Sequence, residues 1–253
     1  MTAESVVTDV ADDISTITIN RPDRSNALDS TTARALATAV GQAANSRVTI
    51  VTGAGKAFCA GGDLEELERW TDLPPEEIGQ TLYEGYQGMI RAIRRSPSIA
   101  IAAINGAAVG AGLDLALACD LRVASTDAKL GQVWVGLGVI PGTGGAWLTQ
   151  ALAGPTRAAE LLLTGRVIEA DEALEVGLVN AVVPAGEVME RARQLAAEIL
   201  KHPRGGVIAN KRAMVAATEA ALEDALDHAR AVQPERFTSD EFREALRARR
   251  SHR

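Results

Sequence analysis

Two segments rich in glycine and alanine could present backbone N–H groups to a substrate. The first, FCAGGDL, spans residues 58–64, and the second, NGAAVGAGLDLALACD, spans residues 105–120. Each lies where a predicted strand ends and a predicted helix begins, so its N–H groups have no partner within the helix and small side chains leave them uncovered. Two such donors at one carbonyl oxygen would stabilise an enolate more than the neutral ground state, which is catalysis of the oxyanion-hole type.

The same glycines also have a purely structural interpretation. Glycine permits tight turns and close packing of a helix against its neighbours. For either segment taken alone this interpretation is the better one. The functional interpretation requires the two loops to meet in space.

A repeated order of strand and helix must position these loops. The sequence predicts strands over residues 14–20, 47–53, 98–104 and 121–125, and helices over residues 30–44, 64–70, 76–95 and 112–119. Beyond about Pro155 the chain is rich in alanine and leucine with helical spacing, and strand signals fade except over residues 178–183. The pattern predicts an α/β fold whose later part is helical.

The composition argues against a nucleic-acid-binding surface. With 253 residues, of which 47% are hydrophobic, the chain can bury a sizeable core as one large domain. Its net charge is −7, whereas phosphate binding needs clustered Lys and Arg on one face. The basic residues near the C-terminus alternate with acidic and apolar residues until the last few positions, which predicts a solvated helix end; they are Arg243, Arg247, Arg249, Arg250 and Arg253.

Sequence patterns for nucleotides, metals and membranes are not met. The glycine-rich segments lack the spacing of a dinucleotide motif, Lys56 lacks the residues that surround a P-loop lysine, and the apolar residues 99–119 are interrupted by Asn105 and Asp114. The N-terminus has no apolar secretory stretch. We therefore expect a cytoplasmic protein with no metal, redox cofactor, membrane span or nucleic-acid partner. Neither the cysteines nor the histidines have the spacing of a disulfide framework or a metal site; they are Cys59, Cys119, His202, His228 and His252.

The order of several motifs resembles the enoyl-CoA hydratase/isomerase (crotonase) family. The resemblance runs from about Ile14 to Arg212 and is carried by RPDRSNALD, GAGKAFCAGGDL, INGAAVGAGLDLALACDLRVAS, GLGVIPGTGG, and the segment from TRAAELLLTG to ADEALEVGLVNAVVP. It implies a crotonase-like spiral of ββα and βαβ units over residues 1–195 and a C-terminal helical trimerisation region over residues 196–253. It also implies coenzyme A thioester substrates, with no other cofactor, and assembly as a homotrimer or a dimer of trimers.

The resemblance also implies roles for single residues. Gly62 and Ala111 match the two oxyanion N–H donors, and Ala60 matches the residue whose carbonyl meets the adenine amino group. Lys211 and Phe237 match positions where C-terminal helices approach the coenzyme, sometimes from the next subunit, and a solvated role for Lys211 is the alternative. The other residues expected at the coenzyme or acyl group are Arg24, Asn26, Ala27, Leu28, Lys56, Gly61, Asp63, Leu64 and Trp134.

The sequence departs from the hydratase pattern at the acid and base positions. Where hydratases of the family use two glutamates, this chain has Asp114 and Trp134, and Gly142 stands where some relatives have a catalytic aspartate. Asp114 is the best candidate for proton transfer; the helix dipole should lower its pKa unless burial raises it by more. Trp134 either forms an aromatic wall of the acyl pocket or fills core space. Acids that could replace the missing glutamate are Glu65, Glu66, Glu68 and Glu84.

Three functions therefore remain open at this point. The first is an enoyl-CoA hydratase/isomerase-type enzyme with Gly62 and Ala111 as oxyanion donors and Asp114 as the proton-transfer group. The second is a non-catalytic acyl-CoA-binding protein, which the Trp134 substitution would favour. The third is a CoA thioester hydrolase on the same scaffold, because an oxyanion site serves any reaction that passes through an enolate or a tetrahedral anion.

Overall fold

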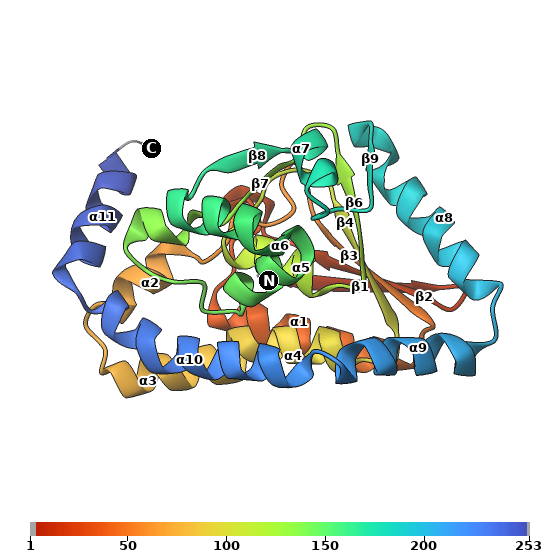
Figure 1. Cartoon of the computed structure of the whole chain (residues 1–253), viewed down its shortest axis with the longest axis horizontal. Coiled ribbons are helices and arrows are strands. Elements are labelled where there is room, and N and C mark those ends of the chain that lie inside the picture. Colours follow the sequence, from red (N-terminus) through yellow and green to blue (C-terminus); the bar gives the residue numbers. More distant parts are fainter. Residues whose placement is uncertain (1–3, 252–253) are drawn as a thin grey trace.

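A six-stranded sheet forms the centre of the computed structural model, which describes residues 4–251 (Figure 1). His252 and Arg253 lie outside the described residues. Strands β2 to β9 of this sheet run parallel, and β1 is added antiparallel to β2 at one edge. In spatial order the strands are β1 (Val6–Ala11), β2 (Ile14–Ile19), β3 (Val48–Gly53), β4 (Ile99–Ile104), β6 (Leu121–Ser125) and β9 (Ala181–Val183).

The strands predicted from the sequence are confirmed, but four others were missed. β2, β3, β4 and β6 agree with the predicted ranges to within one residue at each end, and β9 is the last part of the predicted strand over residues 178–183. β1 was missed because it is a mostly exposed edge strand with acidic neighbours. The second sheet was missed because its strands are too short to show periodicity; they are β5 (Ala108–Val109), β7 (Lys129–Gly131) and β8 (Val167–Glu169).

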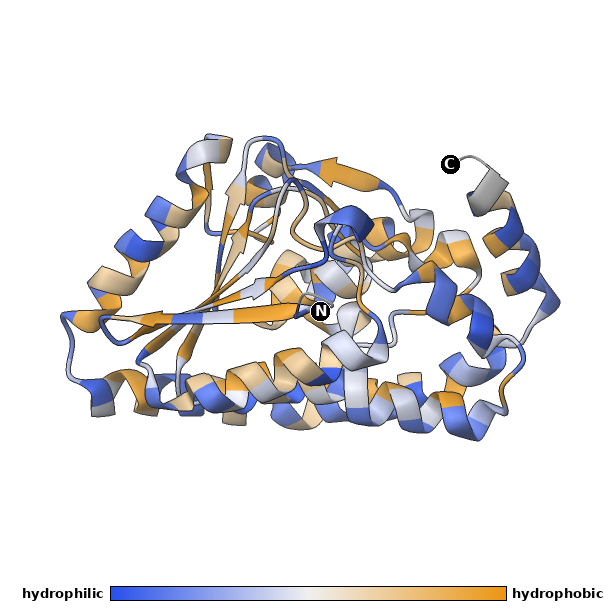
Figure 2. Ribbon diagram, turned by 180° about the vertical axis from the view of Figure 1, so that it is seen from behind, coloured by the Kyte–Doolittle hydropathy of each residue, from blue (hydrophilic) through white to orange (hydrophobic). Residues whose placement is uncertain are grey.

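Helices cover both faces of the large sheet. Successive residues of a strand point to opposite faces, so Ile50 and Ile101 pack against α8, whereas Val51 and Ala102 belong to the larger core on the other side. Both β3 and β4 are buried along their whole length, as expected for parallel strands covered on both faces (Figure 2). The helices are α1 (Ser30–Gln42), α2 (Leu64–Trp70), α3 (Pro75–Thr81), α4 (Gly88–Arg95), α5 (Ala111–Ala118), α6 (Gly145–Thr164), α7 (Ala170–Glu175), α8 (Val188–Leu200), α9 (Arg204–Ala216), α10 (Glu219–Phe237) and α11 (Asp240–Ser251).

The helix predicted over residues 76–95 is divided. A π-helical segment, η3 (Leu82–Gln87), joins α3 to α4. Short 3-10 helices occur at η1 (Pro22–Arg24), η2 (Ala43–Asn45), η4 (Val133–Leu137) and η5 (Ala185–Glu187).

The C-terminal helices pack along the edge of the core. α9 lies against α4, α10 lies against α3 and α6, and α11 returns to contact α2 and η4 (Figure 1). The predicted boundary between residues 195 and 196 falls inside α8, and the division into two regions stays a prediction.

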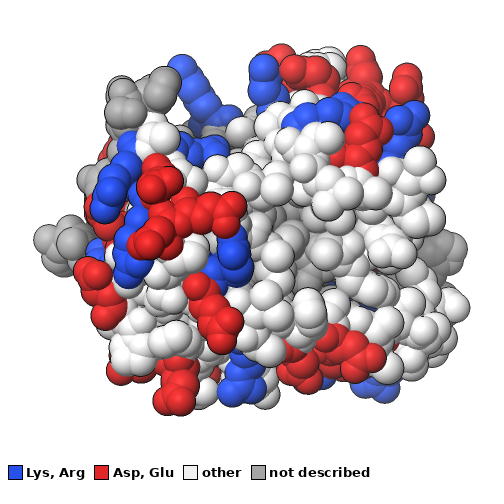
Figure 3. Space-filling model, turned by 60° about the vertical axis from the view of Figure 1, so that its left-hand side comes forward, with Lys and Arg blue, Asp and Glu red and all other residues white. Residues whose placement is uncertain are grey.

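The charged surface is mixed on the face drawn in Figure 3. Lysine and arginine side chains are interspersed there with aspartate and glutamate, and a broad uncharged area lies beside them. That face therefore lacks the single-sign basic patch that nucleic-acid binding needs. Within residues 4–251, no helix combines the length and the apolar composition needed to cross a membrane.

Candidate active site

The two glycine-rich loops lie side by side and are joined by their backbones. Leu28 forms a parallel bridge with Gly62, and Cys59 forms one with Ala108. The N–H of Val109 donates to the carbonyl of Cys59 at 3.1 Å. The first loop is thus held between the chain that follows η1 and the loop that leads into α5.

The N–H groups of Gly62 and Ala111 have no hydrogen-bond partner within residues 4–251. Ala111 is the first residue of α5, where a helical N–H has no intrahelical acceptor, and Gly62 belongs to no helix or strand. The two loops approach closely here, because a Cβ built on Gly61 would lie 3.6 Å from the nitrogen of Ala111 and 2.8 Å from the carbonyl oxygen of Val109. Gly61 also has φ of +90°, a conformation that side chains disfavour. Unpaired donors on neighbouring loops can stabilise an anionic oxygen that reaches both of them.

A cavity of about 840 Å³ adjoins these loops. It extends from η1 past both loops to η4, and Arg249 of α11 completes its lining. Its volume falls within the range of small-molecule sites. The lining includes eight of the residues expected from the sequence: Arg24, Ala27, Ala60, Gly61, Gly62, Asp63, Leu64 and Trp134. It does not include Asn26, Leu28, Lys56, Ala111, Asp114, Lys211 or Phe237.

Asn26 and Leu28 shape the site from behind its surface. Both are fully buried. Asn26 has φ of +57°, and its side-chain amide donates to the carbonyls of Ala54 and Ala57 at 2.8 and 2.7 Å. These hydrogen bonds fix the turn that carries Lys56. Lys56 itself is exposed and lies outside the cavity lining.

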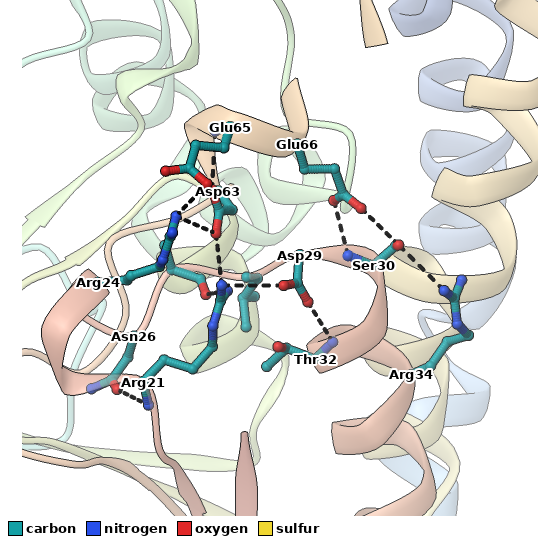
Figure 4. A network of polar contacts seen from close by, with 12 residues as sticks. Arg21, Arg24, Asn26, Asp29, Ser30, Thr32, Arg34, Asp63, Glu65 and Glu66 are labelled. Carbon is teal, nitrogen blue, oxygen red and sulfur yellow. Dashed lines mark hydrogen bonds and ion pairs between the residues drawn. The ribbon is translucent and has the colours of Figure 1, made fainter. Parts of the chain in front are cut away.

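An ion-pair network surrounds the mouth of the cavity (Figure 4). Arg21 donates to Asp63 at 2.8 Å, and Arg24 lies 3.6 Å from Asp63 and 2.9 Å from Glu65. Asp63 also caps α2 by accepting from the N–H of Glu65 at 3.0 Å. Burial raises the pKa of Asp63, but the hydrogen bonds from Arg21 and Glu65 and the charges of Arg21 and Arg24 together lower it below its ordinary value. Asp63 is thus a stable anion that fixes the first loop.

Asp114 has a different environment from the one expected at the start of a helix. Its side chain is fully buried and accepts hydrogen bonds from the Thr143 hydroxyl and, at 2.8 Å, from the Gln132 amide. Burial raises the pKa of Asp114 to about 6, and the hydrogen bonds from Thr143, Gln132 and the Gly145 N–H offset only part of this rise. Desolvation therefore outweighs the helix dipole. The carboxyl titrates near neutral pH but does not line the cavity.

The raised pKa of Asp114 predicts how stability depends on pH. Because the folded state holds the proton more tightly than the unfolded state, the contribution of this group is fully present below its ordinary pKa of 3.8 and is lost as pH rises to about 6. A shift of roughly two units corresponds to about 3 kcal/mol. We expect the free energy of unfolding of Asp114→Asn, relative to wild type, to rise by about this amount between pH 4 and pH 7. Urea unfolding at several pH values measures it.

The exposed substitution Asp171→Asn is the control for this measurement, because it removes the same chemical group without changing a buried contact. An Asp114→Asn difference that stays constant from pH 4 to pH 7 would contradict the raised pKa.

Comparison with known proteins identifies the family of the chain. The family model described as enoyl-CoA hydratase/isomerase matches residues 9–252. The chain belongs to the enoyl-CoA hydratase/isomerase family. The family and fold predicted from the sequence motifs are thereby confirmed, together with the assignment as an enzyme of the lyase or isomerase type.

Relatives of this chain include proteins named for different reactions. This chain is 33% identical over 252 residues to the short-chain-enoyl-CoA hydratase of Clostridium acetobutylicum. The match covers 98% of this chain and 95% of the relative. This chain is also 33% identical over 248 residues to the 1,2-epoxyphenylacetyl-CoA isomerase of Escherichia coli. That match covers 97% of this chain and 95% of the relative. The crystal structure of an enoyl-CoA hydratase from Mycobacterium avium subsp. paratuberculosis has a TM-score of 0.89 and 30% identity, and the match covers 99% of this chain and 97% of the other.

Trp134 lies in the cavity wall. It belongs to η4, is 7% exposed, and packs beside Gly110 of the second loop. Its position matches the aromatic-wall interpretation more closely than that of a side chain that only fills the core.

Lys211 and Phe237 do not reach the cavity of this chain. Lys211 is 5% exposed, and its ammonium group donates to Asp120 at 2.7 Å and to the carbonyl of Ser98 at 2.8 Å. The solvated role considered for Lys211 is therefore wrong, and in this chain it ties α9 to the start of β4. Phe237 is 1% exposed and packs edge to face on Trp70 at 5.0 Å, so it is a core residue. The sequence alone could not show that the side chains of Lys211 and Phe237 are buried away from the cavity.

Glu66 does not replace the missing glutamate of the family. It is 7% exposed and accepts hydrogen bonds from the N–H and hydroxyl of Ser30 (Figure 4). The hydroxyl of Tyr86 also donates to Glu66. Glu65 lines the cavity but is paired with Arg24 at its mouth. Within the described residues, no group of three or more His, Cys, Asp or Glu side chains could hold a metal ion.

Arg249 is a cavity residue that the sequence interpretation missed. It was predicted to lie on a solvated helix end, but α11 brings it to the cavity. The signal was present, because Phe242 and Leu246 are buried and Arg249 follows them at positions i+7 and i+3 on the same face of the helix.

Proposed function

We propose that this protein acts on an enoyl-CoA thioester and stabilises the thioester enolate with the N–H groups of Gly62 and Ala111. The observation that carries the proposal is the pair of unpaired donors on two loops joined by direct backbone bonds, one of which, Gly62, lines a cavity of ligand size. Donors fixed before the reaction act most strongly where charge develops in the transition state. Coenzyme A enters as part of the substrate, and the proposal needs no other cofactor.

The coenzyme would lie toward the mouth of the cavity. Arg24 and Arg249 line the cavity from opposite ends of the chain and would offset the charge of its phosphates. The carbonyl of Ala60 would accept from the adenine amino group, and Ala27 would line the pantetheine. To bind a phosphate fully, Arg24 must weaken its pairs with Asp63 and Glu65.

Asp114 is the proposed proton-transfer group. It lies in the first turn of the helix that begins at Ala111, and its pKa of about 6 suits proton exchange near neutral pH. Because its carboxyl is buried against Thr143 and Gln132, it must change rotamer when the acyl group binds. Trp134 supplies no second carboxylate, so a one-base shift of a proton between carbons is favoured over hydration.

Turnover of enoyl-CoA thioesters tests this function directly. We expect the purified protein to convert at least one member of a panel from crotonyl-CoA to longer 2-enoyl and 3-enoyl thioesters, followed by chromatography of the products. Release of free CoA, read with a thiol reagent, would instead select a thioester hydrolase. Binding of acyl-CoA by calorimetry with no turnover would select a non-catalytic binding protein and overturn the proposal.

Asp114→Asn is expected to lower kcat/KM at least about tenfold and to remove an inflection near pH 6 from the pH–rate profile. The reason is that asparagine can keep the contacts with Thr143 and Gln132 but cannot carry the proton. The measurement is kcat/KM from pH 5 to pH 9 for both proteins. If the rate is unchanged and the inflection is retained, Asp114 is not the proton-transfer group. That result would not bear on the N–H donors of Gly62 and Ala111.

Assembly into a trimer or a dimer of trimers stays a prediction. Several apolar side chains are exposed on the single chain, among them Leu163, Met214 and Val10 at 76%, 65% and 63%. Sedimentation analysis of the purified protein would measure its mass directly.

A further inference from the structure

The direction of the Gly62 N–H is fixed by one residue, Leu28. The carbonyl of Gly61 and the N–H of Gly62 belong to the same trans peptide unit and therefore point in opposite directions. Leu28 donates its N–H to that carbonyl at 2.7 Å, and its own carbonyl accepts the N–H of Asp63 at 2.7 Å. Leu28 thus holds the peptide units on both sides of Gly62, so a movement of Leu28 would turn the proposed oxyanion donor.

A buried phenol holds the carbonyl of Leu28. The hydroxyl of Tyr86, a residue that is 3% exposed, donates to the Leu28 carbonyl oxygen at 2.9 Å. The same hydroxyl lies 2.5 Å from the carboxylate of Glu66 in α2. A phenol has a single proton, so the Leu28 carbonyl and the Glu66 carboxylate share it. Tyr86 therefore connects Leu28 to the helix that follows the first loop.

The residues around this hydroxyl fix its position. Glu66 accepts the N–H of Ser30 at 2.9 Å and the Ser30 hydroxyl at 2.7 Å, which ties α2 to the start of α1 (Figure 4). The ring of Tyr86 packs edge to face on Trp70 at 5.8 Å. Tyr86 also belongs to the π-helical segment η3, and such segments are frequent at functional sites. The hydroxyl is thus a fixed donor.

Tyr86 keeps its proton over the pH range of an assay. Burial raises the pKa of Tyr86 well above its ordinary value, and the charge of Glu66 and the hydrogen bond with Glu66 raise it further. The phenol therefore acts as a hydrogen-bond donor and not as an acid or a base.

We infer that Tyr86 is a positioning residue, which orients the Gly62 N–H for catalysis through the Leu28 carbonyl. The inference rests on the proposed function and adds to it a residue outside the cavity lining. Without the hydroxyl the backbone bonds of Leu28 remain, so the loop still forms, but Leu28 loses its fixed contact and the donor shifts. A misplaced donor loses more in the transition state than in the bound substrate, so kcat falls more than affinity.

Tyr86→Phe tests the inference, because it removes the hydroxyl and keeps the ring. With the enoyl-CoA that the full-length protein converts best, we expect kcat to fall about tenfold and KM to stay within about threefold. The inflection near pH 6 expected from Asp114 should remain, because Tyr86 exchanges no proton with the substrate. Both constants are measured at a temperature at which circular dichroism shows every variant to be folded.

Tyr83→Phe is the matched control. Tyr83 is the other tyrosine of the chain and lies in the same π-helical segment, but it is 40% exposed. Its ring lies against the guanidinium groups of Arg91 and Arg230, at 4.6 and 4.7 Å. Because its hydroxyl does not reach the first loop, kcat and KM should both stay within about twofold of wild type.

Two further replacements of Tyr86 separate the hydrogen bond from the ring. 4-Aminophenylalanine restores a donor at the same place, so kcat should return to within about threefold of wild type. 4-Fluorophenylalanine fills the space of the hydroxyl but donates no proton, so it should lower kcat as Tyr86→Phe does, and it replaces that variant if the latter does not fold.

The outcomes distinguish a positioning role from packing and from the proposed function. A folded protein that lacks the donor at position 86 and keeps the kcat of wild type would overturn the inference. A loss that 4-aminophenylalanine does not restore would also overturn it, as would a rise in KM that accounts for the whole loss of kcat/KM. A wild-type protein that converts no enoyl-CoA would instead overturn the proposed function, and the inference with it.

Discussion

Replacing Ala111 with proline is expected to lower kcat/KM by about a hundredfold to a thousandfold while the protein stays folded. Ala111 is the first residue of α5, and its N–H has no partner within residues 4–251. Proline is well tolerated at the first helical position, because the N–H it lacks is unpaired there anyway. The preceding residue, Gly110, has φ of 55° and ψ of −125°, so it is not in the helical conformation that a following proline disfavours. The substitution removes the proposed oxyanion donor and adds ring atoms beside Gly61, so the fold of the variant is measured separately.

Ala111→Gly is the matched control for this experiment. It keeps the N–H and removes only a methyl group, so kcat/KM should stay within about tenfold of wild type, the limit set by backbone effects of glycine at a helix start. Circular dichroism and the melting temperature show whether each variant is folded. A folded Ala111→Pro protein with wild-type activity would mean that this N–H does not stabilise the enolate. Binding of a saturated acyl-CoA should fall less than kcat, because the lost contact is strongest in the transition state.

The parts of the fold that the sequence predicted are those specified by neighbouring residues. VTIVTG and IAIAAI are continuous apolar runs, and they form the two strands that are buried along their whole length. The break from each strand into glycine and alanine correctly placed the starts of α2 and α5. The family motifs then identified Ala60, Gly61 and Gly62, which line the cavity, but also Ala111, which does not.

Electrostatic environments were harder to predict, because they depend on residues far apart in the chain. The helix dipole at Asp114 is a local effect, but the burial that outweighs it arises with partners 18 and 29 residues away, at Gln132 and Thr143. Lys211 was expected near the coenzyme, with a solvated role as the alternative, yet it pairs with Asp120 across 91 residues. Desolvation cannot be judged until the packing is known.

The cavity wall also depended on distant segments. Arg249 reaches the cavity only because α11 folds back against α2 and η4 (Figure 1). Helical periodicity could have indicated the inward face of α11, but not the element that it faces. Strands of two or three residues, such as β5, are likewise formed by pairing with partners rather than by their own pattern.

Gly112→Ala is expected to lower activity about a hundredfold and to destabilise the protein by about 1 to 3 kcal/mol. A Cβ on Gly112 would lie 2.2 Å from the carbonyl oxygen of Cys59 and 2.8 Å from its carbonyl carbon, so backbone must move. The same carbonyl accepts the N–H of Val109 at 3.1 Å and joins the two loops. The methyl group therefore pushes apart the segments that carry Gly62 and Ala111, and a shift of about 1 Å between oxyanion donors is enough for this loss.

Gly41→Ala tests whether replacing any helical glycine of this protein with alanine lowers activity and stability. Gly41 lies in the last turn of α1 with no atom within 4 Å of its added Cβ, so the substitution should stabilise the helix by up to about 1 kcal/mol and leave kcat/KM unchanged. Urea unfolding measures the loss of stability in Gly112→Ala separately from the loss of activity. If the variant is folded at the assay temperature and the rate still falls, spacing of the loops controls the reaction. If it is folded and fully active, the donors tolerate the displacement, and their convergence on one oxygen cannot be the basis of catalysis.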